Sequence, residues 1–442
     1  MSVGNGSSQH GVCVVGLGKI GLPLAVQIAG KGRRVIGADI NQAVVDLVNA
    51  GTPPFPGEDD LDDRLSAVVA DGMMQARTET QAAMSESDVV VVVVPLIIGD
   101  DYRSDFAALD AATEAVGRGL RPGTLVSYET TLPVGTTRKR FAPRLAELSG
   151  LVAGEDFFVC HSPERVSSGR VFADLRKYPK LVGGINAAST ESAVEFYESI
   201  LDFDDRPDLE RGNGVWPLAS VEAAELTKLA ETTYRDVNIA FANELAVHAD
   251  SLGADISEVI AAANSQPFSH IHQPGIAVGG HCIPVYPHLY LQGDPTALMP
   301  SASRQINDGM PKYAVGKLAG VIGPLQDKVV AVLGLAFRGG VKEAAFSGVF
   351  AVVAELERLG AIALVHDPLY DDDEIAAFGF RPYTLGGDCD GVVVQADHAE
   401  YRGLTPDDFP GAGAVVDGRR VLDRGAFTGS SCRLQVIGGP GT

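Results

Sequence analysis

The feature that most constrains the fold is a glycine-rich turn between an apolar strand and a helix near the start of the chain. Residues 12–15 form a short apolar run of β type, the turn GLGKIG follows at once, and a helical pattern continues to Lys31. A second strand, in RRVIGAD, ends in the acidic residue Asp39. This order of strand, glycine turn, helix and acid-terminated strand predicts a Rossmann-type dinucleotide-binding unit.

The glycines of this turn have separate roles. Gly16 permits the tight turn, Gly18 lets the backbone approach a pyrophosphate, and Gly21 allows close packing of helix on strand. Asp39 follows at about the 20-residue spacing at which a carboxylate accepts hydrogen bonds from an adenosine ribose. No arginine directly follows Asp39, so a 2′-phosphate would meet negative charge, which favours NAD over NADP.

Three more apolar runs, in SDVVVVVVP, GTLVSYETT and DFFVCHSPE, have the β-branched character of parallel strands buried on both faces. Polar residues at the carboxyl ends of such strands lie on the ligand side of a doubly wound sheet. The candidates for a site are therefore Thr130, Thr131, Ser162 and Glu164.

A helical block and a second α/β region follow. From Ser220 to about Ala263, apolar residues recur at three- and four-residue intervals without proline, which predicts a long helix that bridges two α/β halves and forms a dimer seam. Strands in DKVVAVLGLAF, IALVHDP, GVVVQAD and AVVDGRR, with a helix in GVFAVVAELERLGA, restart the α/β pattern. The turn GLAFRGG is not a GxGxxG, so this region is expected to bind another phosphorylated ligand, with a ligand-free scaffold as the alternative.

Charge and cysteine usage exclude several classes of protein. The net charge of −22 argues against nonspecific nucleic-acid binding and against binding to an anionic membrane. The five cysteines are scattered without CxxC spacing, as expected of free thiols in a reducing compartment. They are Cys13, Cys160, Cys282, Cys389 and Cys432.

Targeting and metal signals are weak. The N-terminal MSVGNGSSQH lacks an apolar signal core, and the longest apolar run, residues 89–98, is too short to span a bilayer, so we expect a cytoplasmic protein. His270, His272 and His281 have no acidic or cysteine partner at ligand spacing, so no metal site is predicted.

One lone cysteine lies in an unusual context. In GIAVGGHCIPVYPHLY, residues 275–290, Cys282 stands between a double glycine and a proline. A buried structural thiol is the common role of such a residue, and a nucleophile is the alternative. The double glycine would allow close approach of the chain to a ligand.

Seven motifs in order resemble the UDP-glucose/GDP-mannose dehydrogenase family over nearly the whole chain. They are GLGKIGLPLA, ETTLPVGTT, SPERV with VGG downstream, ELTKLAETTYRDVNIAFANELA, VGGHCIP, RQIND and VVDGR. RDVNIA and GGHCIP most resemble the branch that oxidises UDP-N-acetylhexosamines. The resemblance implies α/β architecture, with two Rossmann-like doubly wound parallel-sheet domains joined by a long central helix. The expected boundaries are 1–210 for the NAD-binding domain, 211–325 for a central dimerisation and cysteine region, and 326–442 for a UDP-sugar-binding domain.

The resemblance also implies roles for matching residues in two successive hydride transfers from sugar C6 to NAD. Cys282 would form a thiohemiacetal and then a thioester. Lys228 would stabilise negative charge at the C6 oxygen, Thr131 would hold the attacking water, and Glu164 would act as base for hydrolysis. A glutamate after Ser-Pro could instead be a helix N-terminal residue. The cofactor-binding set is Gly16, Gly18, Lys19, Ile20, Gly21, Asp39, Val94, Pro95 and Thr130. The substrate-binding set is Arg165, Arg235, Asn238, Gly279, Gly280, His281, Arg304, Phe337 and Arg338.

Departures from the family pattern lie at expected site positions. Thr232 stands where the family has asparagine, and Tyr286 where it has aspartate, both near the reacting carbon. Val94-Pro95 replaces a Thr-Pro beside the nicotinamide. In FRGGVKEAAFSG, Arg338 is kept but Ala345 replaces an arginine.

Three functions fit these residues. The favoured one is an NAD-dependent nucleotide-sugar 6-dehydrogenase, in which the Thr232 and Tyr286 hydroxyls replace part of the lost hydrogen bonding. The alternatives are a two-electron alcohol dehydrogenase acting on an unusual nucleotide or nucleoside sugar, and a non-catalytic NAD-binding homologue. The β-hydroxyacid dehydrogenases also place a lysine on a helix after a Rossmann domain, but they lack the third domain and the GGHC cysteine.

Overall fold

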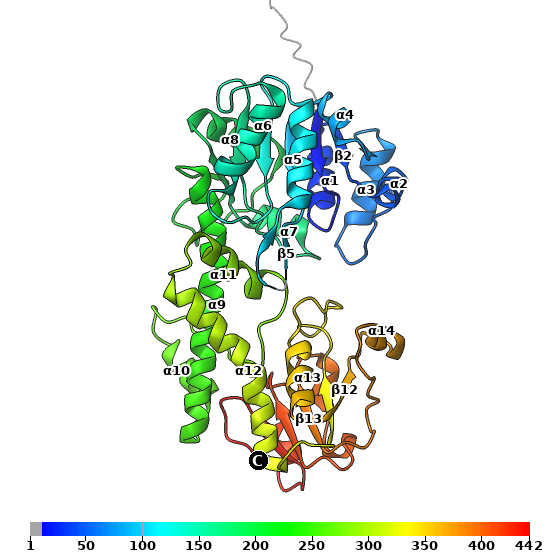
Figure 1. Cartoon of the computed structure of the whole chain (residues 1–442), viewed down its shortest axis with the longest axis vertical. Helices are drawn as coiled ribbons and strands as arrows, with labels where there is room; N and C mark the ends of the chain where they lie inside the picture. Colours follow the sequence, from blue (N-terminus) through cyan, green and yellow to red (C-terminus); the bar gives the residue numbers. More distant parts are fainter. Residues whose placement is uncertain (1–10, 100) are drawn as a thin grey trace, which may run out of the picture. The chain divides into compact units, whose positions relative to one another are not determined.

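The structure, a computed structural model, describes residues 11–99 and 101–442 (Figure 1). The N-terminal segment used above to argue against a signal peptide lies outside the described residues. The chain divides into two compact units, Met1–Ala230 and Glu231–Thr442, each of which is described by itself. The three-part division expected from the sequence stays a prediction.

The first unit is built on an eight-stranded sheet in the order β10-β9-β8-β7-β4-β1-β2-β3. The strands are β1 (Gly11–Val15), β2 (Val35–Ala38), β3 (Met74–Arg77), β4 (Ser87–Val92), β7 (Leu125–Tyr128), β8 (Phe158–His161), β9 (Lys180–Gly184) and β10 (Val215–Pro217). The strands from β3 to β8 are parallel, in the order typical of a Rossmann fold, whereas β9 is antiparallel to β8. A separate hairpin pairs β5 (Ile97–Ile98) with β6 (Ser104–Asp105).

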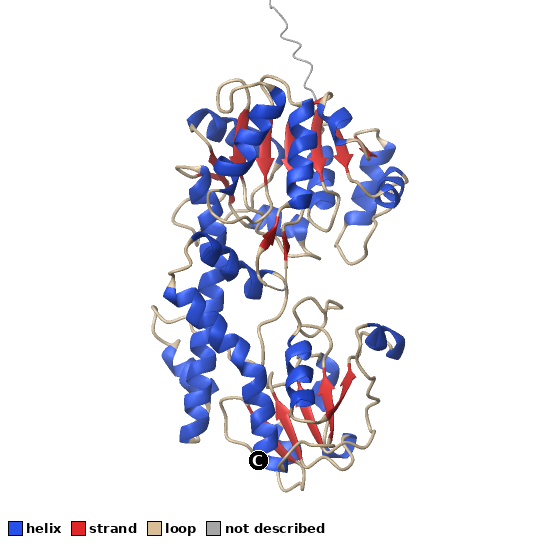
Figure 2. Ribbon diagram, viewed as in Figure 1, coloured by secondary structure: helices blue, strands red, loops and turns tan. Residues whose placement is uncertain are grey.

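Helices cover both faces of this sheet (Figure 2). They are α1 (Gly21–Gly30), α2 (Gln42–Asn49), α3 (Leu61–Ala70), α4 (Thr80–Met84), α5 (Ala107–Gly119), α6 (Ala142–Ser149), α7 (Val171–Lys177) and α8 (Ala187–Ile200), with a π-helical turn η1 (Thr137–Phe141) before α6. Because both faces are covered, the central strands β1 and β4 are almost wholly buried and consist largely of valine. This confirms the strands predicted from the apolar runs.

The helical block that follows the first sheet along the chain contains two helices where the sequence suggested one. The long helix α9 (Val221–Leu252) ends before Gly253, whose φ is +68°, and α10 (Ile256–Ala263) begins after Asp255. A left-handed glycine terminates a helix, and the Asp255 side chain accepts a hydrogen bond from the Ser257 amide to start the next one. The expectation of an unbroken helix to Ala263 is therefore wrong, although the predicted long helix is present.

The second unit contains a five-stranded parallel sheet in the order β12-β11-β13-β14-β15. Its strands are β11 (Val329–Leu333), β12 (Ile362–His366), β13 (Gly391–Val394), β14 (Ala414–Asp417) and β15 (Arg433–Val436). Its helices include α11 (Cys282–Gly293), α12 (Leu298–Ile322), α13 (Gly348–Arg358), α14 (Asp372–Ala377) and α15 (Arg424–Phe427), with 3-10 turns η2 (Ala399–Gly403) and η3 (Pro406–Asp408). This strand order is the other common doubly wound arrangement, so the predicted fold class is confirmed.

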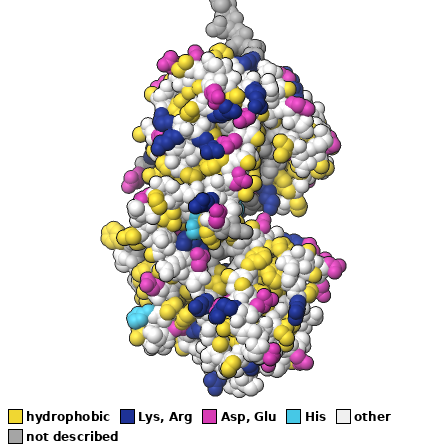
Figure 3. Space-filling view, in the orientation of Figure 1, with side chains coloured by type: hydrophobic (Ala, Val, Ile, Leu, Met, Phe, Trp, Pro, Cys, Tyr) yellow, Lys and Arg dark blue, Asp and Glu magenta, His cyan; other side chains and the backbone are white. Residues whose placement is uncertain are grey.

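The surface carries both signs of charge. On the face shown in Figure 3, Lys and Arg side chains lie among Asp and Glu side chains. Among the described residues, no helix is both long enough and apolar enough to cross a membrane.

Candidate active site

The turn after β1 has the backbone that a dinucleotide site requires. Gly16 has a φ of +95°, and a Cβ on Gly21 would lie 1.9 Å from the Gly16 oxygen, so neither position tolerates a side chain. A Cβ on Gly18 would meet nothing within 4 Å, which leaves an open approach to the backbone. Lys19 is exposed and Ile20 half-buried where α1 begins, so the turn is open to a phosphate there. Within α1 itself the Leu22 amide donates to the Gly18 carbonyl at 3.1 Å, and Pro23 has no amide hydrogen.

Asp39 completes this turn at the end of β2. Its Oδ2 accepts the Leu17 amide at 2.9 Å and its Oδ1 accepts the Asn41 amide at 2.9 Å. The carboxylate is half-buried, and each oxygen keeps a lone pair for a ribose hydroxyl. The residues present therefore fit an NAD adenosine and pyrophosphate.

A hydrogen bond links the loops that follow β4 and β7, next to the turn after β1. Thr130 Oγ1 donates to the Val94 carbonyl at 2.6 Å, which fixes the segment that contains Val94 and the exposed Pro95. Both loops follow carboxyl ends of neighbouring parallel strands, on the side where ligands bind in such sheets.

A buried glutamate anchors the loop that carries Thr131 to α9. Glu225, which is fully buried, accepts the amides of Gly135 at 2.5 Å and Thr137 at 2.9 Å and the Thr137 hydroxyl at 2.7 Å. Lys228 follows one turn later on α9, and Thr131 itself is 7% exposed. The sequence analysis missed Glu225, because its partners are about 90 residues away along the chain.

Glu164 lies in a loop between β8 and α7, not in a helix, with part of its side chain open to solvent. Lys180 at the start of β9 donates to Glu164 Oε2 at 3.0 Å, and the Arg165 amide donates to Oε1 at 2.6 Å. Burial opposes ionisation, but the Lys180 charge together with hydrogen bonds from Glu129, Lys180 and the Arg165 amide holds the pKa of Glu164 below its usual value. The neighbouring candidate Ser162 is fully buried, with its hydroxyl bonded to the Leu181 carbonyl. The candidate Arg165 donates through its guanidinium to the Pro179 carbonyl.

In the second unit, Cys282 is the one exposed thiol among the described residues; Cys13, Cys160, Cys389 and Cys432 are buried. It is the first residue of α11, where unpaired helix amides favour an anionic group. A buried structural thiol is therefore excluded for Cys282. Its position fits a nucleophile that a ligand can reach.

The double glycine before Cys282 packs against the loop that follows β11. A Cβ on Gly279 would lie 2.7 Å from the Phe337 Cβ, and Gly280 has a φ of +81° with its amide donating to the Ala345 carbonyl at 3.2 Å. The ring of His281 lies edge-on to those of Tyr286 and Phe346, at 5.8 and 5.7 Å. Within this unit the structure therefore brings Phe337 and Ala345 next to the cysteine segment.

Two further candidates hold structural contacts in the second unit. Arg304 is 5% exposed and donates to Asp236 at 2.5 Å and to Asp308, so its guanidinium is engaged inside the protein. Asn238 donates to the His270 carbonyl and accepts the His272 amide. Their predicted contacts with substrate stay predictions, as do those of the exposed Arg235 and Arg338.

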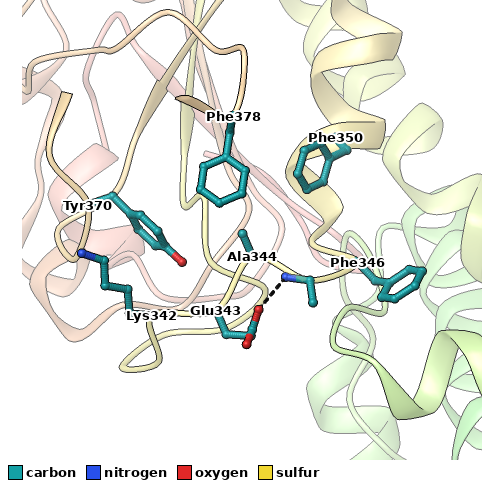
Figure 4. Close-up of a pocket in the computed structure, with 8 residues that line it drawn as sticks. Lys342, Glu343, Ala344, Phe346, Phe350, Tyr370 and Phe378 are labelled. Atoms are coloured by element: carbon teal, nitrogen blue, oxygen red, sulfur yellow. Dashed lines mark hydrogen bonds between the residues drawn. The ribbon is translucent and has the colours of Figure 1, made fainter. Parts of the chain in front are cut away.

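An open aromatic hollow of about 560 Å³ lies beside the carboxyl ends of β11 and β12 (Figure 4). Its lining residues are Lys342, Glu343, Ala344, Ala345, Phe346, Phe350, Tyr370 and Phe378. Ala345, which replaces the family's arginine, leaves Lys342 as the cation of this lining, and Lys342 is paired with Glu374 at 2.5 Å. The sequence analysis did not anticipate this hollow, because Phe350, Tyr370 and Phe378 come from separate segments.

Comparisons with known proteins cover almost the whole chain. Profiles of the UDP-glucose/GDP-mannose dehydrogenase family match residues 10–201 (NAD binding domain), 222–307 (central domain) and 331–424 (UDP binding domain). A UDP-N-acetyl-D-mannosamine dehydrogenase of Pyrococcus horikoshii is 32% identical over 93% of this chain and 96% of its own. The chain belongs to this family.

Other relatives agree with this assignment. An NDP-N-acetyl-D-galactosaminuronic acid dehydrogenase of Ralstonia nicotianae is 34% identical over 90% of this chain and 92% of its own. The solved structure of the Pyrococcus horikoshii UDP-D-ManNAc dehydrogenase superposes with a TM-score of 0.84, at 30% identity over 97% of this chain and 99% of that one. A UDP-glucose dehydrogenase of Pyrobaculum islandicum gives a TM-score of 0.82, at 28% identity over 99% of this chain and 100% of that one.

Family membership confirms three predictions made from the sequence. The chain is an enzyme, its cofactor is NAD, and it acts as a nucleotide-sugar dehydrogenase. Among the described residues, no group of three or more His, Cys, Asp and Glu side chains could hold a metal ion.

Proposed function

We propose that this dehydrogenase oxidises the C6 alcohol of a UDP-N-acetylhexosamine to the uronic acid in two hydride transfers, with Cys282 as the covalent nucleophile. The exposed position of Cys282 at the N-terminus of α11 is the observation that carries the proposal. The substrate class is supported by the relatives that act on UDP-N-acetylmannosamine and by the match to the UDP binding domain.

Bound NAD supplies the hydride acceptor for each oxidation step. The turn at Gly16 and Gly18 and the carboxylate of Asp39 bind and orient it. In the first step the C6 hydroxyl would give its proton to water and the C6–H bond its hydride to the bound acceptor, which leaves an aldehyde. The positive charge of Lys228 stabilises the negative charge that develops on the C6 oxygen.

An aldehyde carries no readily lost hydride until a nucleophile adds to it. The Cys282 thiolate forms a C–S bond to C6, and the carbonyl oxygen takes up a proton to give a thiohemiacetal. Loss of the second hydride and of that proton gives a thioester. Water held by Thr131 then adds to the thioester carbon, the C–S bond breaks with the electron pair returning to sulfur, and Glu164 accepts the proton of the water.

Thr232 and Tyr286 hold the positions at which the resemblance indicates an asparagine and an aspartate. Thr232 is 6% exposed on α9, one turn after Lys228, and Tyr286 lies in the first two turns of α11. We propose that their hydroxyls supply part of the hydrogen bonding to the C6 oxygen and to the water.

The yield of NADH per sugar tests this function. With UDP-N-acetylmannosamine, UDP-N-acetylglucosamine and UDP-glucose as probes, we expect two NADH per uronic acid formed. Cys282→Ser should stop after the aldehyde, at one NADH, whereas the matched control Cys432→Ser should keep two, because Cys432 is buried in the second unit. One NADH per turnover in the unaltered enzyme would favour the two-electron alcohol dehydrogenase, and NAD binding with no NADH from any probe would favour the non-catalytic homologue.

We also propose that the enzyme is a homodimer in the cytoplasm. Exposed large side chains recur along α9, with Tyr234, Phe241 and Leu252 exposed by 58%, 49% and 67%. An unpartnered apolar stripe on a long helix suits a self-complementary interface. Sedimentation of Phe241→Glu should show monomers where the unaltered enzyme shows dimers; an unchanged mass would contradict this interface.

A further inference from the structure

Lys180 joins Glu164 to a second carboxylate that lies deeper in the first unit. Its Nζ is 2.8 Å from Glu129 Oε2 and 3.0 Å from Glu164 Oε2. The side chain of Glu129 is fully buried, that of Lys180 is 5% exposed and that of Glu164 is 12% exposed. The two carboxylates and the ammonium group therefore form a chain with one end buried and the other open to solvent.

Two hydroxyl groups close the buried end of this chain. The Tyr197 hydroxyl of α8 lies 2.5 Å from Glu129 Oε1, and the Ser127 hydroxyl of β7 lies 2.8 Å from that of Tyr197. Because the bond between the two hydroxyls can run in either direction, Tyr197 can donate to an ionised Glu129 or accept from a protonated one. The buried end can thus satisfy either state of Glu129.

The charges of Glu129, Glu164 and Lys180 determine which of the two carboxyl groups holds a proton. With both carboxylates ionised, this buried cluster would carry a net negative charge, which burial disfavours. Burial, helped by the Glu164 carboxylate, raises the pKa of Glu129 to about 8 although Lys180 opposes the shift. Burial acts on Glu164 too, but there Lys180 and hydrogen bonds from Glu129 and Arg165 prevail and the pKa is lowered.

The other titratable groups around the cluster keep a constant charge near neutral pH. Burial raises the pKa of Cys160 to about 12, and burial together with the Glu129 charge raises that of Tyr197 well above its usual value. Burial and the Lys180 charge lower the pKa of His161 to about 3. Only the two carboxyl groups can therefore exchange a proton in the working range.

We infer that Lys180 and Glu129 are positioning residues for Glu164: the three groups hold one carboxyl proton, kept on Glu129, so that Glu164 stays ionised and fixed in place. The inference rests on the proposed function, in which Glu164 accepts the proton of the water that cleaves the thioester. In that step the water O–H bond breaks, the new C–O bond forms, the C–S bond breaks, and Lys180 keeps its own proton. Glu164 then returns the proton to solvent at its exposed edge.

Infrared spectroscopy of the resting protein tests where the proton resides, without any substrate. At neutral pH the unaltered enzyme should show the carbonyl band of a buried protonated carboxyl group. The band should be missing in Glu129→Gln, and it should weaken in Glu164→Gln, where Glu129 and Lys180 alone can form a neutral ion pair. A band that persists in Glu129→Gln, or one absent from the unaltered enzyme, would overturn the inference.

The second test follows hydrolysis of the thioester on Cys282. The enzyme is mixed with UDP-N-acetylmannosamine and NAD and quenched, and the decay of the adduct is followed by intact-protein mass spectrometry against pH. Lys180→Met should move the acid limb of the decay rate to higher pH by about 1 to 3 units, since it removes the cation beside Glu164. Lys180→Arg should restore the limb, because a guanidinium can bridge both carboxylates.

Controls separate this inference from a general loss of stability. Lys31→Met removes a solvent-exposed ion pair with Asp202 in the same unit and should leave the limb in place. If Lys180→Met does not fold, the double variant Lys180→Met/Glu129→Gln removes the deeper carboxylate along with the cation and should show the same shift. If the Lys180 variants form the adduct and NADH but the acid limb of their adduct-decay rate stays at the same pH, the positioning role is refuted and the proposed function is not. Absence of NADH from every sugar would refute the proposed function, and the infrared result would still decide the place of the proton.

Discussion

In both units an aspartate accepts amides of the turn that follows the first strand of the sheet, but the two aspartates differ in how many other hydrogen bonds they make. In each, an aspartate at or just after the end of the second strand accepts turn amides: Asp39 accepts that of Leu17, and Asp367 accepts those of Leu335 and Ala336 at 2.8 Å. Asp39 keeps spare acceptor capacity, whereas Asp367 is 2% exposed and also binds the Leu369 amide and His398 Nε2. The Asp39 carboxylate can therefore still accept hydrogen bonds from a ligand, whereas the Asp367 carboxylate is occupied by partners within the protein.

The turn after β1 is open to a ligand, whereas the turn after β11 is filled by the protein. Helix α1 begins directly after the glycine turn, at Gly21, and a Cβ on Gly18 would meet nothing within 4 Å, so this turn is open. In the second unit α13 begins only at Gly348, and a Cβ on Gly339 would lie 2.3 Å from the Asp397 oxygen, so that turn is filled by the protein itself. A shared strand–turn–helix pattern thus leaves an open turn at Gly18 in the first unit and a filled turn at Gly339 in the second.

Removing the buried carboxylate should have the largest effect. Asp367→Ala leaves three amides and His398 without their acceptor, and we expect a loss of about 3–5 kcal/mol in the free energy of unfolding. Asp39→Ala, the matched variant of the first unit, should cost less than about 1 kcal/mol because its partners can bind water. Urea unfolding of both variants measures the difference. Equal losses would contradict the contrast between the two turns.

The next largest effect concerns NAD binding. Asp39→Ala should weaken NAD by about 10- to 100-fold, or about 1.4–2.7 kcal/mol, through loss of the ribose hydrogen bonds. Asp39→Ser combined with Ile40→Arg should shift the preference to NADP, since Ile40 is 95% exposed next to the carboxylate. Calorimetry with both cofactors measures these changes. Unchanged NAD affinity in Asp39→Ala would show that the free acceptor capacity of Asp39 is not used.

The sequence predicted those parts of this contrast that depend on local pattern. These parts are the valine-rich strands, the GLGKIG turn and Asp39, each of which follows from residues close together in the chain. The exposure of Cys282 did not follow from the sequence, which also allowed a buried structural thiol. The sequence could not show that Asp367 is saturated, because His398 lies 31 residues away and meets it only through the pairing of β11 with β12 and β13.

The same limit explains the site residues that the sequence missed or left in doubt. Lys180 reaches Glu164 and Glu129 because β9 runs antiparallel to β8. The residues of β9 do not indicate its direction in the sheet, so the sequence could not predict this contact. Arg304 was predicted to bind substrate, yet its ion pair with Asp236 spans 68 residues. The break between α9 and α10 was missed because a single glycine is tolerated in many helices.

A smaller effect should come from closing the open space above the first turn. Gly18→Ala adds a methyl group that meets nothing within 4 Å, so the free energy of unfolding should change by about 1 kcal/mol or less. NAD affinity should fall about tenfold, because the methyl group occupies the approach of the pyrophosphate. Gly339→Ala is the matched change in the filled turn, and it should lower stability without changing NAD affinity. NAD binding unaffected by Gly18→Ala would remove this turn from the cofactor site.

The smallest predicted effect is the pH dependence of the saturated carboxylate. Burial opposes ionisation of Asp367, but His398 and the turn amides outweigh it and hold the pKa below the usual value of 3.8. A lowered pKa means that the unfolded chain binds the proton more tightly, so the stabilisation is fully present above pH 3.8 and is lost as the pH falls through the folded pKa. The difference in unfolding free energy between the unaltered enzyme and Asp367→Asn should therefore be constant at neutral pH and shrink in acid, as measured by urea unfolding at a series of pH values. A difference that grows in acid would mean that the fold favours the protonated carboxyl, and the contrast with Asp39 would then rest on burial alone.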